Sequence, residues 1–554
     1  MKTRSVSEIL KTHVRLELEC VDRLYLNGYV PSLQTGGGIS YFFGVHRGQP
    51  VVSPALMEQM RKDWMGRVEA WWDRQQVPLV EFAKGERKDD LAQRRRHRWQ
   101  GGAGVVFVGT AQEKEWAVRG AKRVSCGGTV RFDFERRQVF VKHYYFYFED
   151  RGGGARDKRR PENGRAEQWG PGFLKVCSYF PFAMKLCVNG HEWAKVQARQ
   201  AGLEFKALDN GFASCAQAQQ FQSLCDGLSA GDLEALLGRL RARIPWPWSA
   251  ADVQAGYDWT LSIWQLETSL TQVFDQPRHG RELFESIIRD NLDLGRPERV
   301  ALVVEGKITA ATPGQFATRI ITRDIHPSLH VSYKHCGLKQ YFKEGRALRT
   351  ETTINNPRDF EVGKALKNFC HLRPIGRHCN RRLLDVERAG DMTCYSSQTL
   401  QRLIEPSVTS DGTRAPGLKY GSPRVMALLC ALHLMLMVPA GFRHGALRRQ
   451  VARLLGVEEA EYRSTQMSYD LRRLRLKGLI TRQPGTQRYT VTPYGLNLAA
   501  MLTRLHQRVL RPACAAVEAL PESSDPPSRL TAALHELQAS ISELCEKAHL
   551  TKAA

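Results

Sequence analysis

Apolar and polar residues alternate along this chain at two spacings, which change from segment to segment. Residues 14–20 alternate with a period of two, as a half-buried strand does, and residues 104–109 form a short continuous apolar run. Residues 54–76 instead repeat their apolar positions at helical spacing. Strands that alternate with helices and then follow one another predict a mixed α/β sheet within residues 1–212. Further strands are expected at residues 77–82, 130–134, 139–148, 173–179 and 184–188, and a helix at residues 190–201.

The next segments have different patterns. Residues 150–172 are rich in Gly and charge without periodicity, which predicts a flexible loop. Residues 213–298 favour helices, and residues 299–415 return to strand-like patterning in an α+β basic core region. The expected fold class is therefore α+β with several domains. The helices expected in the first of these two regions span residues 215–228, 231–244, 250–273 and 280–291.

Residues 422–511 predict three helices followed by a hairpin. The helices are expected at residues 426–438, 445–455 and 461–477, and Gly478 is a typical helix stop. Residues 479–492 then indicate a strand, a Pro-Gly turn and a second strand, before a last helix from residue 493. This order is typical of a winged helix-turn-helix module, which binds nucleic acid. Use of the same module for protein contact is the alternative.

This segment resembles the winged-helix modules of MarR-like transcription factors. The likeness rests on YDLRRLRLKGLI at residues 469–480 and RYTVTPYG at residues 488–495. It implies duplex DNA binding, with the third helix in the major groove and the hairpin on the backbone. It also makes a homodimer plausible. The residues expected to contact nucleic acid here are Arg448, Arg449, Tyr462, Gln466, Tyr469, Arg472, Arg473, Arg475, Lys477, Arg482 and Arg488.

The charge of the chain agrees with a polyanionic partner. Its 81 Lys and Arg against 57 Asp and Glu give a net charge of +24, and such an excess favours phosphate polymers. Residues 333–355 add a second basic strip in which aromatic rings accompany the cations, a combination typical of a nucleic-acid groove. The partner expected is duplex DNA, with RNA also open. The cations of this strip are Lys334, Lys339, Lys343, Arg346 and Arg349.

Four residues are candidates for catalysis of phosphodiester chemistry, and each also has a non-catalytic explanation. Glu305 begins an acid-x-Lys tripeptide after an apolar strand, and Asp22 is expected near a strand end; carboxylates so placed can hold Mg²⁺ in nucleases. Glu351 shares one face of a strand with Arg349, as a structural or catalytic ion pair. Tyr341, among cations, could be a nucleophile with a lowered pKa. Surface solvation or phosphate contact explains the same residues, and no cofactor other than this Mg²⁺ is expected.

Other sequence features bear on partners and compartment. Thirteen Cys without regular spacing are typical of reduced thiols, and the N-terminus lacks the apolar stretch of a signal peptide. The longest apolar run, residues 426–438, is too short to span a bilayer. These features predict a cytoplasmic protein without membrane contact. Residues 527–550 predict an amphipathic helix whose apolar seam either docks on the preceding module or mediates a homodimer.

Four stretches outside the C-terminal module, at residues 142–147, 189–195, 208–213 and 346–355, resemble an uncharacterised family of bacterial proteins. That resemblance implies one architecture and no particular mechanism. The sequence thus predicts a nucleic-acid-binding protein, targeted to DNA by its winged helix, whose large body also contacts phosphates. The alternative is a metal-dependent nuclease or a transposase- or recombinase-like enzyme of a mobile element or defence system.

Overall fold

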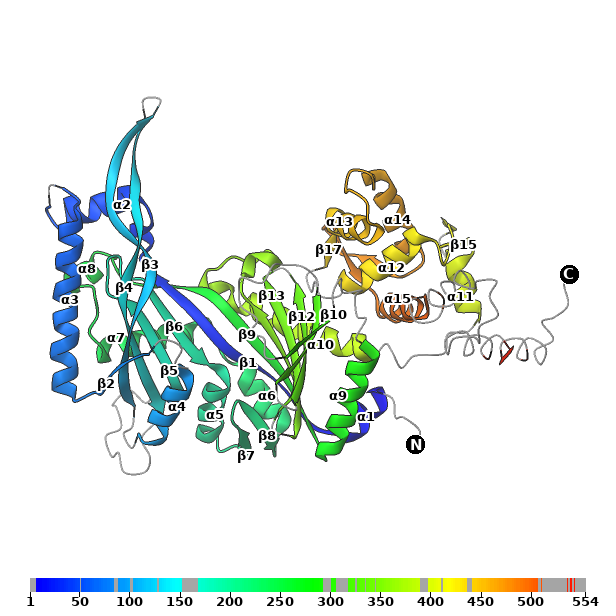
Figure 1. Cartoon of the computed structure of the whole chain (residues 1–554), viewed down its shortest axis with the longest axis horizontal. Coiled ribbons are helices and arrows are strands. Elements are labelled where there is room, and N and C mark those ends of the chain that lie inside the picture. The colour runs from blue at the N-terminus through cyan, green and yellow to red at the C-terminus, as the bar shows by residue number, and fades with distance from the viewer. Residues whose placement is uncertain are drawn as a thin grey trace, which may run out of the picture. The chain divides into compact units, whose positions relative to one another are not determined.

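The computed structural model divides into two compact units, which are described separately. The first consists mainly of Glu8–Leu292 and Pro297–Arg381, and the second mainly of Arg382–Ala554. The described residues contain fifteen α-helices and one large mixed sheet, so the fold class is α+β (Figure 1). The structure describes residues 6–49, 51–83, 88–99, 103–126, 129–151, 168–291, 300–304, 317–323, 326–333, 335–343, 345–388, 397–409, 412–435 and 441–506, with a few isolated positions beyond.

The first unit is built on a twelve-stranded sheet in the order β10-β11-β12-β13-β14-β9-β1-β6-β5-β4-β3-β2. Its central strand β1 (Val14–Tyr29) lies antiparallel between β6 (Met184–Asn189) and β9 (Thr260–Phe274). The pairs β2–β3 and β10–β11 are parallel, which makes the sheet mixed. The other strands are β2 (Leu79–Glu81), β3 (Gly104–Cys126), β4 (Thr129–Arg151), β5 (Gln168–Cys177), β10 (Val300–Val304), β11 (Ala317–Arg323), β12 (His326–Tyr333), β13 (Cys336–Lys343) and β14 (Ala347–Ile354).

Strand β1 is covered on both faces near its middle. The period of two seen at its start gives way to five consecutive buried residues, from Leu18 to Asp22. The pairing with β9 shifts its register between Val21 and Leu24, so a bulge lies at Asp22. Bulges redirect side chains locally, and this one adjoins the buried charges described below.

Helices pack on both sides of this sheet. Helices α5 (Gly190–Gln200) and α6 (Ala218–Asp226) contact β1, whereas α9 (Pro277–Asn291) contacts β9, β13 and β14. Helix α3 (Pro54–Gln75) packs on β4, where the ring of Trp64 meets Tyr144 edge-on. The remaining elements of this unit are α1 (Val6–His13), α2 (Gly36–Tyr41), α4 (Lys88–His97), α7 (Ala230–Arg243), α8 (Ala250–Gln254) and the small sheet β7 (Phe205–Leu208) with β8 (Gly211–Cys215). Helix α10 (Phe369–Arg388) includes the point in the chain at which the two units are divided, between Arg381 and Arg382.

The second unit packs helices around a three-stranded sheet. Its helices are α11 (Ser397–Ile404), α12 (Pro423–Met435), α13 (His444–Leu455), α14 (Ser464–Leu476) and α15 (Pro493–Leu505). The strand order is β17-β19-β18, from β17 (Phe442–Arg443), β19 (Arg488–Val491) and β18 (Ile480–Arg482). Leu428, Leu447, Leu474 and Leu498 are fully buried in the shared core. A short ribbon of β15 (Ser407–Val408) and β16 (Arg414–Ala415) completes the unit.

The structure corrects several expectations about secondary structure. The strand that begins at residue 104 runs on to Cys126, and the strands expected at residues 130–134 and 139–148 are one strand, β4. The helix expected at residues 250–273 is wrong, because only α8 is helical there and β9 follows it. Strand β9 is rich in Thr, aromatic and branched residues and is hydrogen-bonded on both sides, by β1 and β14. Residues 213–298 are therefore not helical throughout, and strands expected in separate regions belong to one sheet.

Two expectations fall largely outside the described residues. Within the loop expected at residues 150–172, positions 152–167 are not described, and the strand β5 begins at Gln168. Most of the amphipathic helix expected at residues 527–550 also lies outside them. Of the helices that are described, none is both long and apolar enough to cross a membrane.

Candidate functional site

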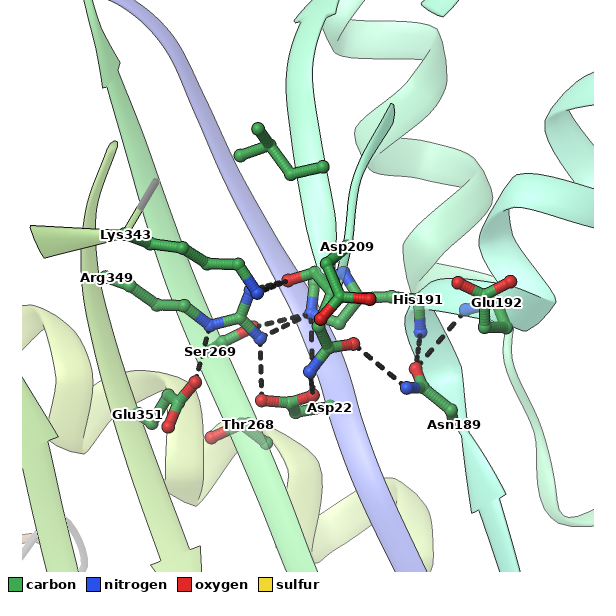
Figure 2. A network of polar contacts seen from close by, with 12 residues as sticks. Asp22, Asn189, His191, Glu192, Asp209, Thr268, Ser269, Lys343, Arg349 and Glu351 are labelled. Carbon is green, nitrogen blue, oxygen red and sulfur yellow. Dashed lines mark hydrogen bonds and ion pairs between the residues drawn. The ribbon is translucent and has the colours of Figure 1, made fainter. Parts of the chain in front are cut away.

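A cluster of buried charge surrounds Arg349, which has no exposed surface (Figure 2). Its Nε donates to Oε1 of Glu351 at 2.5 Å, and its Nη2 donates to Oδ2 of Asp22 at 2.6 Å. The same Nη2 lies 3.0 Å from Nε2 of His191, and Nη1 donates to the backbone oxygen of Asn210. The guanidinium thus links β14 to β1, to the start of α5 and to the turn between β7 and β8.

The strand register explains how these groups meet. Arg349 and Glu351 are two positions apart on β14, so both side chains lie on one face of the sheet. Glu351 is opposite Ser269 of β9, which is opposite Cys20 of β1. Because Asp22 follows Cys20 by two positions, it extends the same face. Residues from three adjacent strands therefore converge although they are distant in sequence.

The first turn of α5 closes this cluster. Asn189 caps the helix, since its Oδ1 accepts from the backbone N–H groups of His191 and Glu192. The cap aims His191 inward, with its Nε2 2.9 Å from Oγ of Ser269. The neighbouring Gly190 lies against the backbone of β1, where a Cβ would collide with the carbonyl oxygen of Val21. The close approach permitted by this glycine brings the helix start onto the strand.

The electrostatics of the cluster favour a closed ion-pair network. Burial alone would raise the pKa of Asp22, but the charge of Arg349, with further contributions from His191 and Asn210, lowers it well below its usual range. Burial would likewise lower the pKa of Arg349, but Asp22 and Glu351 raise it. Both partners are therefore charged, and each charge compensates the other inside the protein.

This geometry corrects three site expectations. The pKa of Tyr341 is raised, by burial and by the charge of Glu351, and its hydroxyl donates to Oε1 of Glu351 at 2.8 Å. Tyr341 is thus not a nucleophile with a lowered pKa. Arg349 is fully enclosed and does not reach an external phosphate. Asp22 and Glu351 already hold this arginine, so the arrangement is a structural ion-pair network and not a pair of carboxylates free to bind Mg²⁺.

Glu267 of β9 is a further member of this region that the sequence did not indicate. Burial, and then the negative charges of Asp22 and Glu351, raise its pKa to about 7. Its Oε1 accepts from Nε2 of Gln265 at 2.6 Å. Glu267 is therefore a carboxyl group that changes charge near neutral pH beside a fixed ion pair. The sequence pattern predicts a helix around Glu267, and a helix there gives no reason to expect this residue beside β1 and β14.

A cleft of about 460 Å³ opens beside the cluster, between α4, β1, β6 and the start of α5. It reaches the cluster through Asn189, whose Nδ2 donates to Oδ1 of Asn210. Four acidic residues lie among its lining, against two arginines and one histidine. A groove for a polyanion needs an excess of cations, so this cleft does not have the character of a nucleic-acid groove. The charged lining residues are Arg23, Asp89, Arg96, His97, Glu149, Glu192 and Asp209.

The basic strip expected at residues 333–355 is only partly a surface feature. Lys339 is half-buried, with Nζ 4.1 Å from the ring centre of Tyr341, and Lys343 directs Nζ toward the carbonyl oxygen of Asn210 at 3.4 Å. Arg346 is exposed in the turn between β13 and β14. Lys334 and Glu305 lie outside the described residues. With Arg349 enclosed, the strip does not form one continuous cationic groove.

Helix α14 of the second unit presents a polar, cationic face. Thr465, Ser468, Tyr469, Arg472 and Arg475 are all exposed, at intervals of three, one, three and three residues. Side chains at such intervals share one side of a helix. Tyr469 keeps 45% of its surface exposed. The opposite side carries the apolar residues that enter the core.

Three residues expected to contact nucleic acid instead hold this unit together. Tyr462 is only 4% exposed, and both its hydroxyl and Nη2 of Arg473 donate to the buried carboxylate of Asp470. The Nζ of Lys477 donates to the backbone oxygens of Arg402 and Glu405, at 2.5 and 2.6 Å. The polar atoms of these side chains are hydrogen-bonded inside the unit, where they fix α14 to its core and to the segment that contains Arg402 and Glu405.

The remaining expected residues are divided between surface and internal contacts. Arg449 on α13 and Arg482 on β18 are exposed. Arg448 pairs with Glu459, with Nη2 2.6 Å from Oε1, and Arg488 donates to the backbone oxygen of Gly441 at 2.9 Å. Gln466 accepts from the backbone N–H of Arg463 at 2.9 Å, as part of the α14 cap.

One group of side chains in the described part has the residue types of a metal site. The ligand atoms of His13, Asp275 and His279 all lie within 4.8 Å of one another. Asp275 already bridges both imidazoles, at 2.9 Å to His13 and 2.7 Å to His279. These hydrogen bonds join the end of α1 to the start of α9, and they account for the clustering without a metal.

Comparison with protein-family models, with curated proteins and with solved structures finds no match to this chain.

Proposed function

We propose that the protein binds duplex DNA through its second unit, as a winged helix-turn-helix with α14 in the major groove. The observation that carries this proposal is the exposed face of α14, on which Tyr469, Arg472 and Arg475 share one side with two hydroxyl residues. Arg and hydroxyl side chains on one helix face are suited both to base edges and to phosphates. No carboxylate lies on that face, because Asp470 is fully buried.

The order of elements supports the proposal. Helix α12 is followed by β17, α13, α14, β18 and β19, and the strands are arranged as β17-β19-β18. This is the sequence of elements in a winged helix, with α13 and α14 as the helix-turn-helix and β18–β19 as the wing. The resemblance to MarR-like modules, carried by residues 469–480 and 488–495, points the same way.

The charges around α14 support a phosphate-contacting role for the neighbouring elements. Arg449 and Arg453 are exposed on α13, and Arg482 is exposed beside the tip of the wing. The turn that joins β18 to β19 contains exposed Pro484 and Gly485, the latter with a positive φ of 68°. A glycine there allows a tight turn. The wing is thus short and narrow, as a backbone contact requires.

The test compares two double variants of the full chain in binding to a labelled DNA duplex across a salt series. Arg472→Ala with Arg475→Ala should weaken binding and lower the slope of log K against log salt by about two, roughly one per lost phosphate contact. Lys62→Ala with Arg74→Ala removes the same charge from exposed positions on α3 and is the matched control. Equal losses in both variants would mean that only net charge matters, and unchanged binding in the first would refute the assignment of α14.

The enzymatic alternative gains no comparable observation. Asp22 and Glu351 are engaged by Arg349, the pKa of Tyr341 is raised, and Glu305 lies outside the described residues. Cleavage of labelled DNA or RNA in the presence of Mg²⁺ that is lost in Glu351→Gln would nevertheless restore that reading.

A further inference from the structure

Strands β3 and β4 form a long hairpin that extends beyond the neighbouring strands of the first unit (Figure 1). Its register sets three pairs opposite one another: Gln112 with Lys142, Lys114 with Phe140, and Trp116 with Gln138. Directly opposed residues of an antiparallel pair have their side chains on the same face. These six side chains, which we call the hairpin face, therefore lie together on one surface.

The hairpin face exposes two large aromatic rings. Trp116 is 62% exposed and Phe140 is 68% exposed. The Nζ of Lys114 lies 5.6 Å from the ring centre of Phe140. Because Phe140 is two positions from the residue opposite Trp116, the two residues are diagonal neighbours on the hairpin face, with an expected spacing of roughly 7–8 Å between their positions on the strands. Exposed rings beside cations suit a ligand that is both flat and anionic.

The carboxylates Glu113 and Glu115 of β3 turn to the opposite face, where each lies beside a nitrogen-bearing side chain. Glu113 accepts from Lys88 at 2.8 Å and also from Lys175, and Glu115 lies 3.5 Å from Nε2 of His143. The hairpin face is left with two lysines, two glutamines and two rings, and without an acidic residue. Of these six side chains, only the lysines carry charge, and that charge is positive.

We propose that the hairpin face binds single-stranded nucleic acid, with bases stacked on Trp116 and Phe140 and phosphates held by Lys114 and Lys142. Every base has an aromatic face, so such stacking is tolerant of sequence. The amides of Gln112 and Gln138 can donate and accept hydrogen bonds at base edges.

The geometry favours a single strand over a duplex. Bases inside a duplex have both faces covered by their neighbours and cannot stack on an external ring. This inference goes beyond the duplex contact proposed for α14 and uses none of its residues.

The test measures binding of the full chain to fluorescein-labelled oligo(dT) and oligo(U) of about 20 nucleotides by fluorescence anisotropy. Trp116→Ala with Phe140→Ala should weaken binding about thirtyfold or more, since each stacked base contributes at least a fivefold factor. Trp116→Tyr with Phe140→Tyr should retain most of the affinity. Leu79→Ala removes an exposed apolar side chain from β2, outside the hairpin face, and should leave binding unchanged.

A second variant tests the cations without touching the rings. Lys114→Gln with Lys142→Gln should lower the single-strand salt slope by about 1.4, or about 0.7 for each cation. The alanine variant of the hairpin should keep its duplex affinity, and the α14 variant should keep its single-strand affinity, so the two proposals fail separately. The comparison of oligo(dT) with oligo(U) tells DNA from RNA.

Two outcomes would overturn the proposal. One is single-strand binding that is unchanged in both hairpin variants. The other is a wild-type chain that binds neither oligonucleotide but binds vesicles of phosphatidylcholine with phosphatidylserine through Trp116 and Phe140. That result would assign the hairpin face to contact with a membrane surface.

Discussion

Replacing Glu267 by Gln tests the electrostatic description of the buried cluster most directly. In the folded protein, burial and the charges of Asp22 and Glu351 raise the pKa of Glu267 from 4.5 to about 7. Between these values the folded state binds more protons than the unfolded state, so stability falls as pH rises through this window. Gln has nearly the same shape and does not titrate, so the variant should lose this pH dependence.

The size of the effect follows from the shift in pKa. A pKa raised from 4.5 to about 7 costs the folded state about 0.8 kcal/mol at pH 5 and about 3.4 kcal/mol at pH 8.5. The free energy of unfolding of Glu267→Gln, relative to wild type, should therefore increase by about 2.5 kcal/mol between about pH 5 and about pH 8.5. Above pH 7 the penalty in the wild type approaches its full value.

The assay can be confined to the relevant unit. All eleven Trp residues lie at or before position 264, within the first unit, and none lies in Arg382–Ala554. Urea unfolding followed by tryptophan fluorescence therefore reports the unit that contains Glu267. The transition should be fitted on its own, because a chain of two units need not unfold in a single step.

Glu234→Gln provides the control, because it removes a carboxylate from an exposed position on α7 in the same unit. A stability difference between Glu267→Gln and wild type that is the same at both pH values, within about 0.5 kcal/mol, would refute the assigned cause. An equal pH dependence in the control would attribute the effect to net charge.

Two further substitutions test the buried ion pairs. Arg349→Met should lower the stability of the first unit by about 3–5 kcal/mol, because it leaves the carboxylate of Asp22 buried without its partner. Urea unfolding followed by tryptophan fluorescence measures this loss. A loss below about 1 kcal/mol would contradict the role of Arg349 as that partner. Since the pKa of Asp22 is lowered in the folded state, the stability that it contributes is present above its unfolded pKa and lost as pH falls, and this acid sensitivity should shrink in the variant. Asp470→Asn should lower the free energy of unfolding of the second unit by about 3 kcal/mol, because Arg424 and Arg473 lose a fully buried carboxylate. Circular dichroism follows the melting of that unit, and an unchanged transition would show that the carboxylate is dispensable.

Local periodicity predicted much of the secondary structure. Helices α3, α5, α12, α13 and α14 begin and end within a few residues of their expected positions, because each has its own apolar stripe and end signals. The pairing of Arg349 with Glu351 was likewise expected from their alternation on one strand. These features depend on residues that are close in sequence.

Features that depend on distant residues could not be predicted in this way. The partner of Arg349, Asp22, is 327 residues away, and only the position of β1 at the centre of the sheet brings the two together. The expected phosphate contacts of Tyr462 and Arg473 were wrong because their burial depends on how α14 packs on α12 through Asp470. The hairpin face was not foreseen because β3 was expected to end near residue 109, whereas it runs on to Cys126 through a charge-rich stretch.

The central place of β1 has a consequence for how this chain is made. Its hydrogen-bonding partners β6 and β9 are completed only when residues 189 and 274 have been synthesised. At the usual 5–20 residues per second, the ribosome needs on the order of 10 to 50 s to pass from the end of β1 to the end of β9. Both edges of β1 are open until β6 has been made, and one edge stays open until β9 follows, which allows pairing with other nascent chains. Expression at lower temperature or with added holdase chaperones should therefore raise the soluble yield more for this protein than for one whose first strands pair with their immediate successors.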